Sequence, residues 1–373
     1  MSVDRILARK AREISTGIPI EIEQRELLEK VKASGAKATC FFNNKGGVGK
    51  TTLVANLAAE LALNFGARVL VVDGDPQCNL TQYVLGEEDA VAIYANKDSE
   101  PDSVYSVIRP LSLGKGYGDR LPIRTAPSFG FDIIVGDPRL ALQEDLLAQD
   151  WRDAKAGGMR GIRTTFVFAD VVSKAKGLNY DFVFFDMGPS LGAINRSILL
   201  AMDFFVVPMA IDIFSMWAIK NIGTTVAVWQ RELKVGMTLA EEPNELSTSE
   251  QLRDLRFLGY VTQQHKERGG SEPDPDAGDD EAMRKRIVQA YLDISTGFPE
   301  EIKKHLNGFY DLTKMDPHLG DIRHLGSLAP RSQSQHTPMI SVRGTGSYTQ
   351  LRKQARDIYR KIAVRYLENM CVE

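Results

Sequence analysis

Residues 43–52 of the chain read Asn43-Asn44-Lys45-Gly46-Gly47-Val48-Gly49-Lys50-Thr51-Thr52. The run nearly matches G-x-x-x-x-G-K-[ST], the pattern of a loop that binds nucleotide phosphates, although Asn44 takes the place of the first glycine. Because asparagine tolerates left-handed backbone angles better than most residues other than glycine, the turn can form without that glycine. The sequence therefore predicts a phosphate-binding loop at this position.

The residue types of this loop suit a polyphosphate. Glycines let the backbone approach the phosphates closely, and the loop N–H groups together with the N-terminus of the next helix supply positive potential. Lys50 can reach the β- and γ-phosphates, the Thr51 hydroxyl can bind Mg²⁺, and Thr52 can reach the α-phosphate. We therefore assign consecutive residues to the nucleotide: Gly46, Gly47, Val48, Gly49, Lys50, Thr51 and Thr52.

The sequence on either side of the loop predicts a strand–helix–strand unit. Residues 38–42 and residues 68–72 are short apolar runs typical of buried strands. Between them, in residues 52–65, leucine or phenylalanine recurs every four residues, as on the buried face of a helix, and Gly66 is placed to end that helix. Such a unit implies two parallel strands joined by a right-handed crossover.

The rest of the chain continues this alternation. Helical stretches separate most of the further apolar runs, which favours an α/β fold with a doubly wound, mostly parallel sheet flanked by helices. We expect residues 87–130 to be irregular, because they contain several glycines and prolines, and residues 348–370 to form a C-terminal helix. The further strand candidates are residues 131–135, 182–185, 204–207, 258–262 and 325–328.

Carboxylates stand at the ends of two of these strands. Asp73 ends the strand that follows the phosphate loop, with Asp75 two residues later, and Asp186 ends the run at residues 182–185. Because ligands of parallel sheets bind at the carboxyl ends of the strands, we expect these carboxylates to face the nucleotide. An apolar strand that ends in aspartate is a pattern by which nucleotide hydrolases bind Mg²⁺.

A lysine at the start of the loop, in addition to Lys50, is unusual among phosphate loops. With Lys45, the loop resembles the deviant Walker A motif, K-G-G-x-G-K-[ST], of the ParA/MinD family of ATPases. The resemblance implies that Lys45 crosses a dimer interface and contacts the nucleotide of the partner subunit. By analogy with an arginine finger, such a cation stabilises charge on the transferring phosphoryl group and contributes about 10³–10⁵ in rate.

The segments after the strands are also similar to this family. Asp75 stands in a D-x-D-P-Q string that resembles the switch I segment of ParA proteins, and its Pro-Gln pair favours the ParA branch over MinD. The resemblance implies that Asp75 orients the attacking water and that Asp73 lies near the Mg²⁺. It also identifies Asp186 as the Walker B aspartate, which binds Mg²⁺, and places Gly188 in switch II, where a backbone N–H contacts the γ-phosphate.

The resemblance covers about residues 37–370. The strand at residues 258–262 matches the place where the family carries a residue that reads adenine, commonly asparagine; here Thr262 or Gln263 stands, and we assign Thr262. The segment at residues 328–331 matches a later loop that packs on the base, which assigns Pro330 to the nucleotide.

Composition and charge exclude several classes of protein. With 373 residues, 43% hydrophobic and 25% charged, the chain can bury a sizeable core and is not broadly disordered. A net charge of -3 excludes a strongly basic coat, although it leaves a local basic patch open. The cysteines, Cys40, Cys78 and Cys371, are too few and too scattered for a disulfide framework or an iron–sulfur cluster.

We divide the chain into an N-terminal helical arm, residues 1–36, and a ParA-like ATPase domain, residues 37–373, with a flexible acidic insertion at about residues 266–283. The arm is either one or two solvated helices packed on the domain or a segment that binds a partner. The C-terminal helix is a docked helix of the domain, an amphipathic membrane helix, or a basic face that contacts DNA phosphates.

The expected function is that of a ParA-like ATPase that uses ATP and Mg²⁺, with Lys45, Lys50 and Asp75 as its catalytic residues. The resemblance implies a homodimer that forms with ATP, binds DNA non-specifically, positions a plasmid, a chromosome region or another cargo, and is released by slow hydrolysis that a ParB-like or other adaptor protein stimulates. Because no apolar run approaches about 20 residues, and no secretory signal is visible, we expect a cytoplasmic protein. The alternatives are a MinD-like ATPase recruited to a membrane and a nucleotide-stabilised adaptor with negligible turnover.

Overall fold

A single sheet organises the molecule. The computed structural model describes residues 19–95, 102–247, 249–263, 294, 296–311 and 314–372. Within these residues, eight strands form one sheet in the order β3-β4-β2-β5-β1-β6-β7-β8, and every pairing is parallel except that of β3 with β4. The strands are β1 (Lys37–Phe41), β2 (Val69–Asp73), β3 (Ile123–Ala126), β4 (Phe131–Ile134), β5 (Phe182–Asp186), β6 (Phe204–Ala210), β7 (Arg256–Gln263) and β8 (His318–Ile322). The predicted doubly wound, mostly parallel sheet is thereby confirmed.

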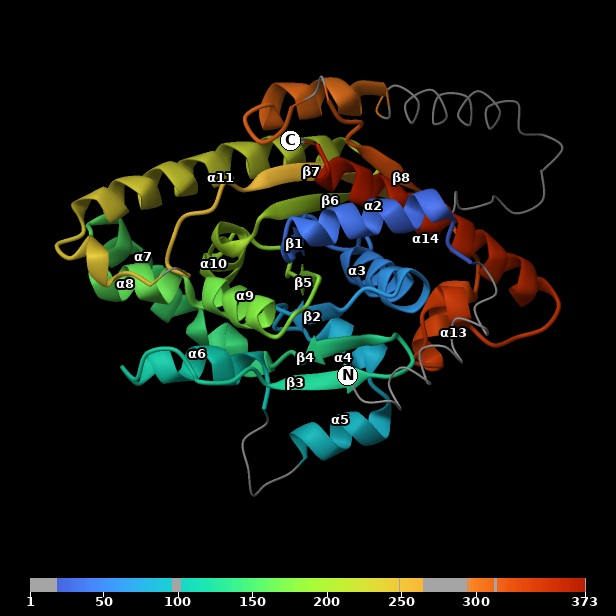
Figure 1. Cartoon of the computed structure of the whole chain (residues 1–373), viewed down its shortest axis with the longest axis horizontal. Coiled ribbons are helices and arrows are strands. Elements are labelled where there is room, and N and C mark those ends of the chain that lie inside the picture. Colours follow the sequence, from blue (N-terminus) through green and yellow to red (C-terminus); the bar gives the residue numbers. More distant parts are fainter. Residues whose placement is uncertain are drawn as a thin grey trace, which may run out of the picture.

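Helices cover both faces of the sheet, and each face has its own apolar core (Figure 1). One layer contains α2 (Ile22–Ala33), α3 (Lys50–Glu60), α4 (Asn79–Val84), α5 (Glu87–Tyr94), α13 (Leu328–Ser334) and α14 (Ser347–Met370). The other contains α6 (Val104–Ser112), α7 (Glu144–Lys155), α8 (Met159–Thr165), α9 (Val167–Gly177), α10 (Ala193–Ala201) and α11 (Ile213–Leu239). A π-helix, η1 (Leu61–Phe65), extends α3, and short 3-10 helices lie at η2 (Pro138–Gln143), η3 (Pro243–Glu245) and η4 (Met339–Ser341).

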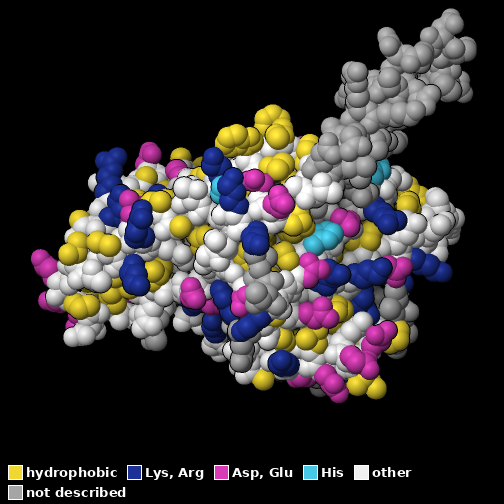
Figure 2. Space-filling view, turned by 90° about the horizontal axis from the view of Figure 1, so that it is seen from above, with side chains coloured by type: hydrophobic (Ala, Val, Ile, Leu, Met, Phe, Trp, Pro, Cys, Tyr) yellow, Lys and Arg dark blue, Asp and Glu magenta, His cyan; other side chains and the backbone are white. Residues whose placement is uncertain are grey.

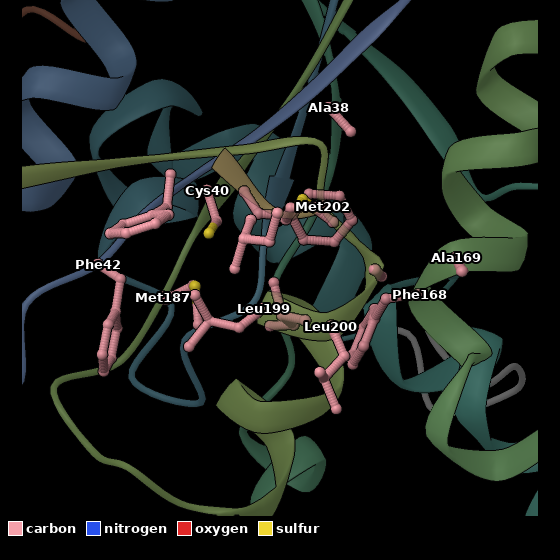
Figure 3. Packing of buried hydrophobic residues seen from close by; sticks show 14 of the residues in the cluster. Ala38, Cys40, Phe42, Phe168, Ala169, Met187, Leu199, Leu200 and Met202 are labelled. Atoms are coloured by element: carbon pink, nitrogen blue, oxygen red, sulfur yellow. The ribbon is translucent and has the colours of Figure 1, made fainter. Parts of the chain in front are cut away.

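The strand that leads into the phosphate loop is buried on both faces. β1 lies between β5 and β6, and its side chains alternate between the two cores. Ala38, Cys40 and, just after the strand, Phe42 pack in the same cluster as Leu199 of α10 (Figure 3), whereas Phe41 packs in the cluster on the opposite face. The loop therefore starts from a rigid, central position at the carboxyl end of the sheet.

Two of the strand and loop predictions were wrong. Residues 325–328 are not a strand, and β8 is the last strand of the described residues. Leu325 precedes α13 and Leu328 begins it, and both are apolar because they are buried in the core on that face of the sheet. Residues 87–130 are not irregular throughout, because they include α5, α6 and the antiparallel edge strand β3. A four-residue strand at the edge of a sheet leaves too short a pattern to recognise from sequence.

The C-terminal helix is docked on the sheet. Four residues form the apolar stripe of α14. Ile362 and Leu367 are part of the buried core, and Leu351 and Ile358 are partly buried against it, so the protein itself covers the stripe. On the basic side, Arg352 donates to a backbone carbonyl of residue 342 and Arg356 to one of residue 340. Several of its basic side chains are thus engaged within the chain.

The N-terminal segment contributes one described helix. Leu28 and Val31 of α2 are buried in the core that also contains α14, and the two helices lie side by side in Figure 1. Residues 1–18 of the predicted arm, and the predicted acidic insertion at residues 266–283, lie outside the described residues.

A buried ion pair joins the helix of the phosphate loop to α14. Glu60 of α3 is fully buried, and Arg360 of α14 donates to its carboxylate. We expect Arg360→Ala to lower the free energy of unfolding by about 3–5 kcal/mol, because the Glu60 carboxylate would stay buried without its cationic partner and keep only the neutral Asn64 amide as a donor. Urea denaturation measures this loss. Lys353→Ala, on an exposed position of the same helix, is the matched control and should change stability little. An Arg360→Ala loss no larger than that of the control would contradict the prediction.

Candidate functional site

The phosphate loop bridges the end of β1 and the start of α3. The side chain of Asn43 holds its first part, since its Nδ2 donates to Pro208 O at 2.7 Å and its Oδ1 accepts from Lys45 N at 2.9 Å. The left-handed residues of the loop are Gly47 (φ +74°) and Gly49 (φ +70°). Asn44 does not have positive φ, so it replaces glycine without needing the left-handed backbone conformation.

Lys50 lies beneath the loop with its side chain almost enclosed. Its ammonium group donates to Asn43 O at 3.2 Å and to Lys45 O at 3.1 Å, and the residue is 8% exposed. Burial lowers the pKa of Lys50, while the carboxylates of Asp186 and Asp75 act in the opposite direction. The charge is thus held in place by backbone carbonyls at the position where the phosphates of a nucleotide would lie.

Thr51 and Asp186 form a pair that could hold a divalent cation. Thr51 Oγ1 donates to Asp186 Oδ2 at 2.7 Å, and Asp186 Oδ1 is buried without a hydrogen-bond partner. Burial, with Asp73 nearby, raises the pKa of Asp186 to about 8. An enclosed, unpaired carboxylate oxygen beside a hydroxyl group provides the hard oxygen ligands that Mg²⁺ prefers. The residues present therefore fit a Mg²⁺ ion.

Asp73 faces inward and accepts hydrogen bonds from α4. Its Oδ2 accepts from Thr81 N at 2.8 Å and from Thr81 Oγ1 at 2.6 Å, and burial raises its pKa to about 6. These bonds engage Oδ2 of Asp73 and hold the start of α4 close to Thr51 and Asp186. Among the described residues, no three His, Cys, Asp or Glu side chains form a metal site, so a Mg²⁺ here would also need nucleotide or water oxygens.

Asp75 lies at the surface of the site. It is 7% exposed, and its Oδ1 accepts from Gln77 N at 2.9 Å. Gly188 of switch II is its neighbour, since a methyl group placed on Gly188 would lie 3.3 Å from Asp75 Oδ1. The structure therefore brings the segments that follow β2 and β5 together, because these two strands are neighbours in the sheet.

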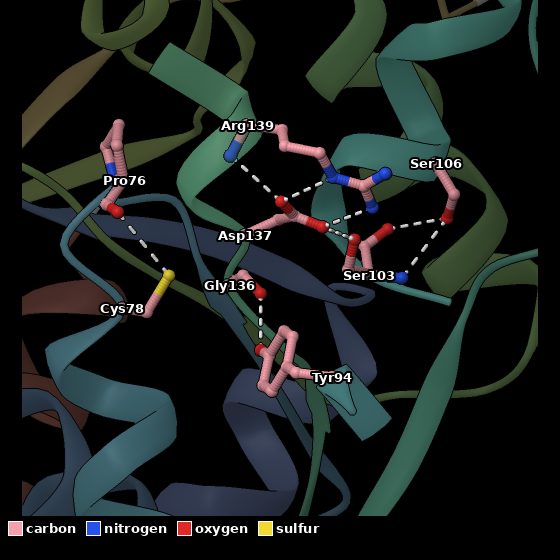
Figure 4. Close-up of polar contacts among 8 residues, drawn as sticks. All are labelled: Pro76, Cys78, Tyr94, Ser103, Ser106, Gly136, Asp137 and Arg139. Atoms are coloured by element: carbon pink, nitrogen blue, oxygen red, sulfur yellow. Dashed lines mark hydrogen bonds and ion pairs between the residues drawn. The ribbon is translucent and has the colours of Figure 1, made fainter. Parts of the chain in front are cut away.

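The loop after β4 closes over switch I on its inner side. A methyl group on Gly136 would lie 2.8 Å from Asp73 Oδ2, and Tyr94 donates to Gly136 O at 2.6 Å (Figure 4). The next residue, Asp137, accepts from Ser103 and from Arg139 in the same view. These bonds fix the backbone against which Asp73 packs.

A cavity of about 590 Å³ opens beside the loop. Of the residues assigned from sequence, those that line it are Gly46, Gly47, Gly49, Lys50, Thr51, Thr52 and Asp75. The assigned residues that lie outside its lining are Lys45, Val48, Asp73, Asp186, Gly188, Thr262 and Pro330. Residues that sequence reasoning missed complete the wall: Gln77, Asn79, Gln82, Tyr83, Pro189 and Gln333. Most of these are polar side chains carried by α4, directly after switch I, and by α13.

The two residues assigned to adenine lie apart from this cavity. The hydroxyl of Thr262 bonds to Asp321 on β8. Its neighbour Gln263 instead reaches the phosphate loop, donating to Gly49 O at 3.1 Å, and a methyl group on Gly49 would overlap its amide. Pro330 lies in α13, the helix that also supplies Gln333. No signal in the sequence marks Gln82 or Gln333, because their meeting depends on the packing of α4 against α13.

Lys45 extends to the rim of the site and is held by α11. Its ammonium group forms an ion pair with Asp212, the N-cap residue of α11, and lies 5.8 Å from the ring centre of Phe214. Asp212 also caps that helix by accepting from Ser215 N at 3.0 Å. In this structure the first lysine of the loop is thus engaged within its own chain.

Comparison with known proteins finds matches over the same region. The family model described as an AAA domain matches residues 36–239. The sporulation initiation inhibitor protein Soj of Bacillus subtilis is 31% identical over 205 residues, which cover 54% of this chain and 70% of that protein. The probable plasmid-partitioning protein ParA of Thermus thermophilus is 31% identical over 183 residues, or 49% of this chain and 47% of that protein. Protein IncC of Escherichia coli is 29% identical over 210 residues, or 56% of this chain and 50% of that protein. The chain thus spans about half the length of the last two.

Solved structures give a similar result. A protein from Corynebacterium diphtheriae is 31% identical, with a TM-score of 0.63, and the match covers 80% of this chain and 97% of that chain. Apo McdA from Cyanothece, at 15% identity and a TM-score of 0.51 over 88% of this chain and 99% of that chain, is similar in fold alone. The sequence comparisons and the structure comparisons therefore both match the part of the chain that contains the phosphate loop.

Proposed function

This chain belongs to the ParA/MinD family of P-loop ATPases, and we propose that it hydrolyses ATP to switch between a monomer and a homodimer that partitions or positions DNA or another cargo. The observation that carries the proposal is a phosphate loop with two lysines, one beneath the loop and one at its rim. Lys50 is buried next to Asp186 and Asp75, whereas Lys45 reaches the surface beside α11. Lys50 is the lysine that a single active site needs, whereas Lys45 is suited to act on another molecule.

We place the phosphates of ATP against residues 46–52, and the base between α4 and α13. The loop N–H groups and Lys50 would hold the phosphates, and Gln82 and Gln333 would offer amide groups to the base. Thr51 and Asp186 would hold Mg²⁺, which when bound neutralises charge that develops on the phosphates.

Asp75 is our candidate for the residue that orients the attacking water. It lines the cavity, whereas the neighbouring Asp73 is engaged by Thr81. Gly188, next to Asp75, would place a backbone N–H near the γ-phosphate. This arrangement would let the protein align water and phosphate with groups from two separate switch segments.

The surface around Lys45 supports the dimer. Ile213, Phe214 and Trp217 at the start of α11 are 51%, 67% and 56% exposed. Large exposed side chains of this kind beside a functional site are typical of a contact surface. A second copy that docked here would bring its own phosphate loop opposite Lys45.

The cargo and partners are proposed from the relatives. The matched proteins include a plasmid-partitioning and a sporulation-control protein, which favours DNA as the cargo and a ParB-like or other adaptor as the stimulating partner. On the face shown in Figure 2, Lys and Arg side chains are interspersed with Asp and Glu, and three arginines of α14 are engaged within the chain. DNA binding would therefore depend on a basic surface created by the dimer, and we expect it to weaken steeply with salt.

A MinD-like membrane switch is the second candidate, and the structure removes the feature on which it depended. The apolar stripe of α14 is packed on the core. Sedimentation with liposomes and ATP tests what remains of this candidate.

The central test is Asp75→Ala. We expect ATP binding to persist and ATP turnover to fall by about 100-fold or more, because water would no longer be oriented. Phosphate release measures turnover, and size-exclusion chromatography with light scattering should find the variant as an ATP-stabilised dimer. Asp89→Ala, at an exposed position of α5, is the control. Normal turnover in Asp75→Ala would refute the assignment, and a wild-type chain that releases no phosphate with ATP, DNA and candidate partners would favour the adaptor with negligible turnover.

A further inference from the structure

A buried side chain holds the loop that follows β5. Asn195, in the first turn of α10, is 2% exposed, and its amide nitrogen donates to Gly188 O at 2.8 Å and to Ser190 O at 2.7 Å. An asparagine amide has two N–H groups, so both are directed at carbonyls of this loop. The shape of residues 188–190 therefore depends on where Asn195 lies.

The first turn of α10 is itself fixed from α7. The carboxylate of Glu144 accepts hydrogen bonds from the backbone amides of Ala193 and Ile194. These are the first two residues of α10 and directly precede Asn195. A carboxylate at a helix N-terminus satisfies donors that have no partner within the helix and interacts favourably with the helix dipole. The turn that carries Asn195 is thus anchored to a neighbouring helix.

Arg196 ties the same turn to both α7 and α11. Its guanidinium group lies 4.5 Å from the ring centre of Trp151 on α7 and 5.7 Å from that of Trp229 on α11, and it donates to Leu147 O at 3.2 Å. The residue is 9% exposed, and burial lowers its pKa to about 10. A cation held between two tryptophans restricts rotation and sliding of α10 relative to both helices.

The loop that Asn195 holds faces the residue proposed to orient water. A methyl group on Gly188 would lie only 3.3 Å from Asp75 Oδ1, so a small shift of Gly188 changes its separation from Asp75. Alignment of reacting groups is sensitive to such shifts, and a displacement of about 1 Å can cost about 100-fold in rate.

We propose that Asn195 is a positioning residue for hydrolysis, which sets the distance between switch II and Asp75 without touching the nucleotide. The inference rests on the proposed ATPase function. Asn195 acts through the carbonyls of Gly188 and Ser190, and α10 supplies the fixed support through Glu144 and Arg196. Its loss should therefore slow the chemical step and leave the phosphate loop intact.

The chain offers a matched control. Asn369 on α14 is also buried, and its amide also bridges two backbone carbonyls, Leu258 O and Asp316 O, both at 2.8 Å. These carbonyls lie near the start of β7 and before β8, at the amino ends of the strands, whereas the phosphate loop lies at the carboxyl ends. Asn369→Ala thus removes the same two bonds without affecting switch II.

The experiment compares Asn195→Ala with Asn369→Ala in the full chain. We expect kcat for ATP to fall about 10- to 100-fold in Asn195→Ala only, with the Kd of a fluorescent ATP analogue changed less than about threefold in both. Both variants should lose similar thermal stability. Equal kcat values, or an Asn195→Ala defect confined to nucleotide affinity, would overturn the proposal.

A second variant and a second readout guard against misfolding and against failure of the proposed function. Asn195→Val keeps most of the volume of the side chain and removes both donors without burying a charge, so it should reproduce the kcat defect if Asn195→Ala does not fold. Hydrogen exchange of residues 187–192 should become faster in the Asn195 variants and stay unchanged in Asn369→Ala. If the wild type hydrolyses no ATP, the proposed function fails, and unchanged exchange in the Asn195 variants would separately refute the role of Asn195.

Discussion

Lys50→Ala is expected to abolish ATP turnover, with a loss of at least about 100-fold, the effect typical of removing one preorganised donor from a site that stabilises developing charge. The ammonium group of Lys50 is held by Asn43 O and Lys45 O, and no other side chain of the described cavity lining carries a positive charge. Without it, the negative charges of the phosphates and of Asp186 would have no cation from the same cavity lining, and only Mg²⁺ and a lysine from a second subunit would remain. Phosphate release measures the loss of turnover, and a fluorescent ATP analogue measures any loss of nucleotide binding.

The same substitution should leave the folded chain largely intact. Burial disfavours the charged form of Lys50 and lowers its pKa, so removing the ammonium group also removes a desolvation penalty. We therefore expect a cooperative unfolding transition close to that of the wild type, which separates a catalytic defect from misfolding. Lys353→Ala is the control for removing a lysine elsewhere. A Lys50→Ala protein that hydrolyses ATP normally would refute the enzyme assignment.

The centre of the fold was predictable because its signals are local. The run at residues 43–52 and the apolar strands beside it define a unit whose geometry follows from the sequence alone. The aspartates that end β2 and β5 come together since parallel strands present their carboxyl ends at one edge. Gly66, which adopts a left-handed conformation after η1, also ends the helical segment where expected.

The other wall of the cavity was not predictable for the opposite reason. Gln82 and Gln333 are separated by most of the chain, and nothing in either segment distinguishes them from surface glutamines. Likewise, Thr262 faces β8 and Gln263 faces the loop because side chains alternate along β7, and a shift of one residue in the strand reverses that assignment. The support of switch II by Asn195 depends on three helices that meet only in the folded chain.

Lys45→Ala is expected to lose about 10³-fold or more in turnover and to remain monomeric with ATP, if Lys45 acts on the nucleotide of a second subunit in the manner of an arginine finger. Light scattering after size-exclusion chromatography measures the dimer, and phosphate release measures turnover. Because Lys45 donates no side-chain bond to its own phosphate loop, ATP binding to the monomer should be retained. In a mixture of Lys45→Ala and Asp75→Ala chains, a mixed dimer would have one site with its own Asp75 and the partner's Lys45, so turnover should partly return. A Lys45→Ala chain that dimerises with ATP would contradict the role across the interface.

The contact between Lys45 and Asp212 gives this prediction a second, smaller arm. Before Lys45 can reach a partner, it must leave Asp212, so the ion pair competes with dimer formation. Both side chains are about one third exposed, which limits the pair to about 0.2–1 kcal/mol, or at most about fivefold in the dimerisation constant for each subunit. Asp212→Asn removes the charge and retains an oxygen that can cap α11 through Ser215 N. It should therefore dimerise at lower ATP or protein concentration than the wild type. The opposite shift would mean that Asp212 is needed in the dimer, since a residue that merely restrains Lys45 in the monomer cannot stabilise the closed state.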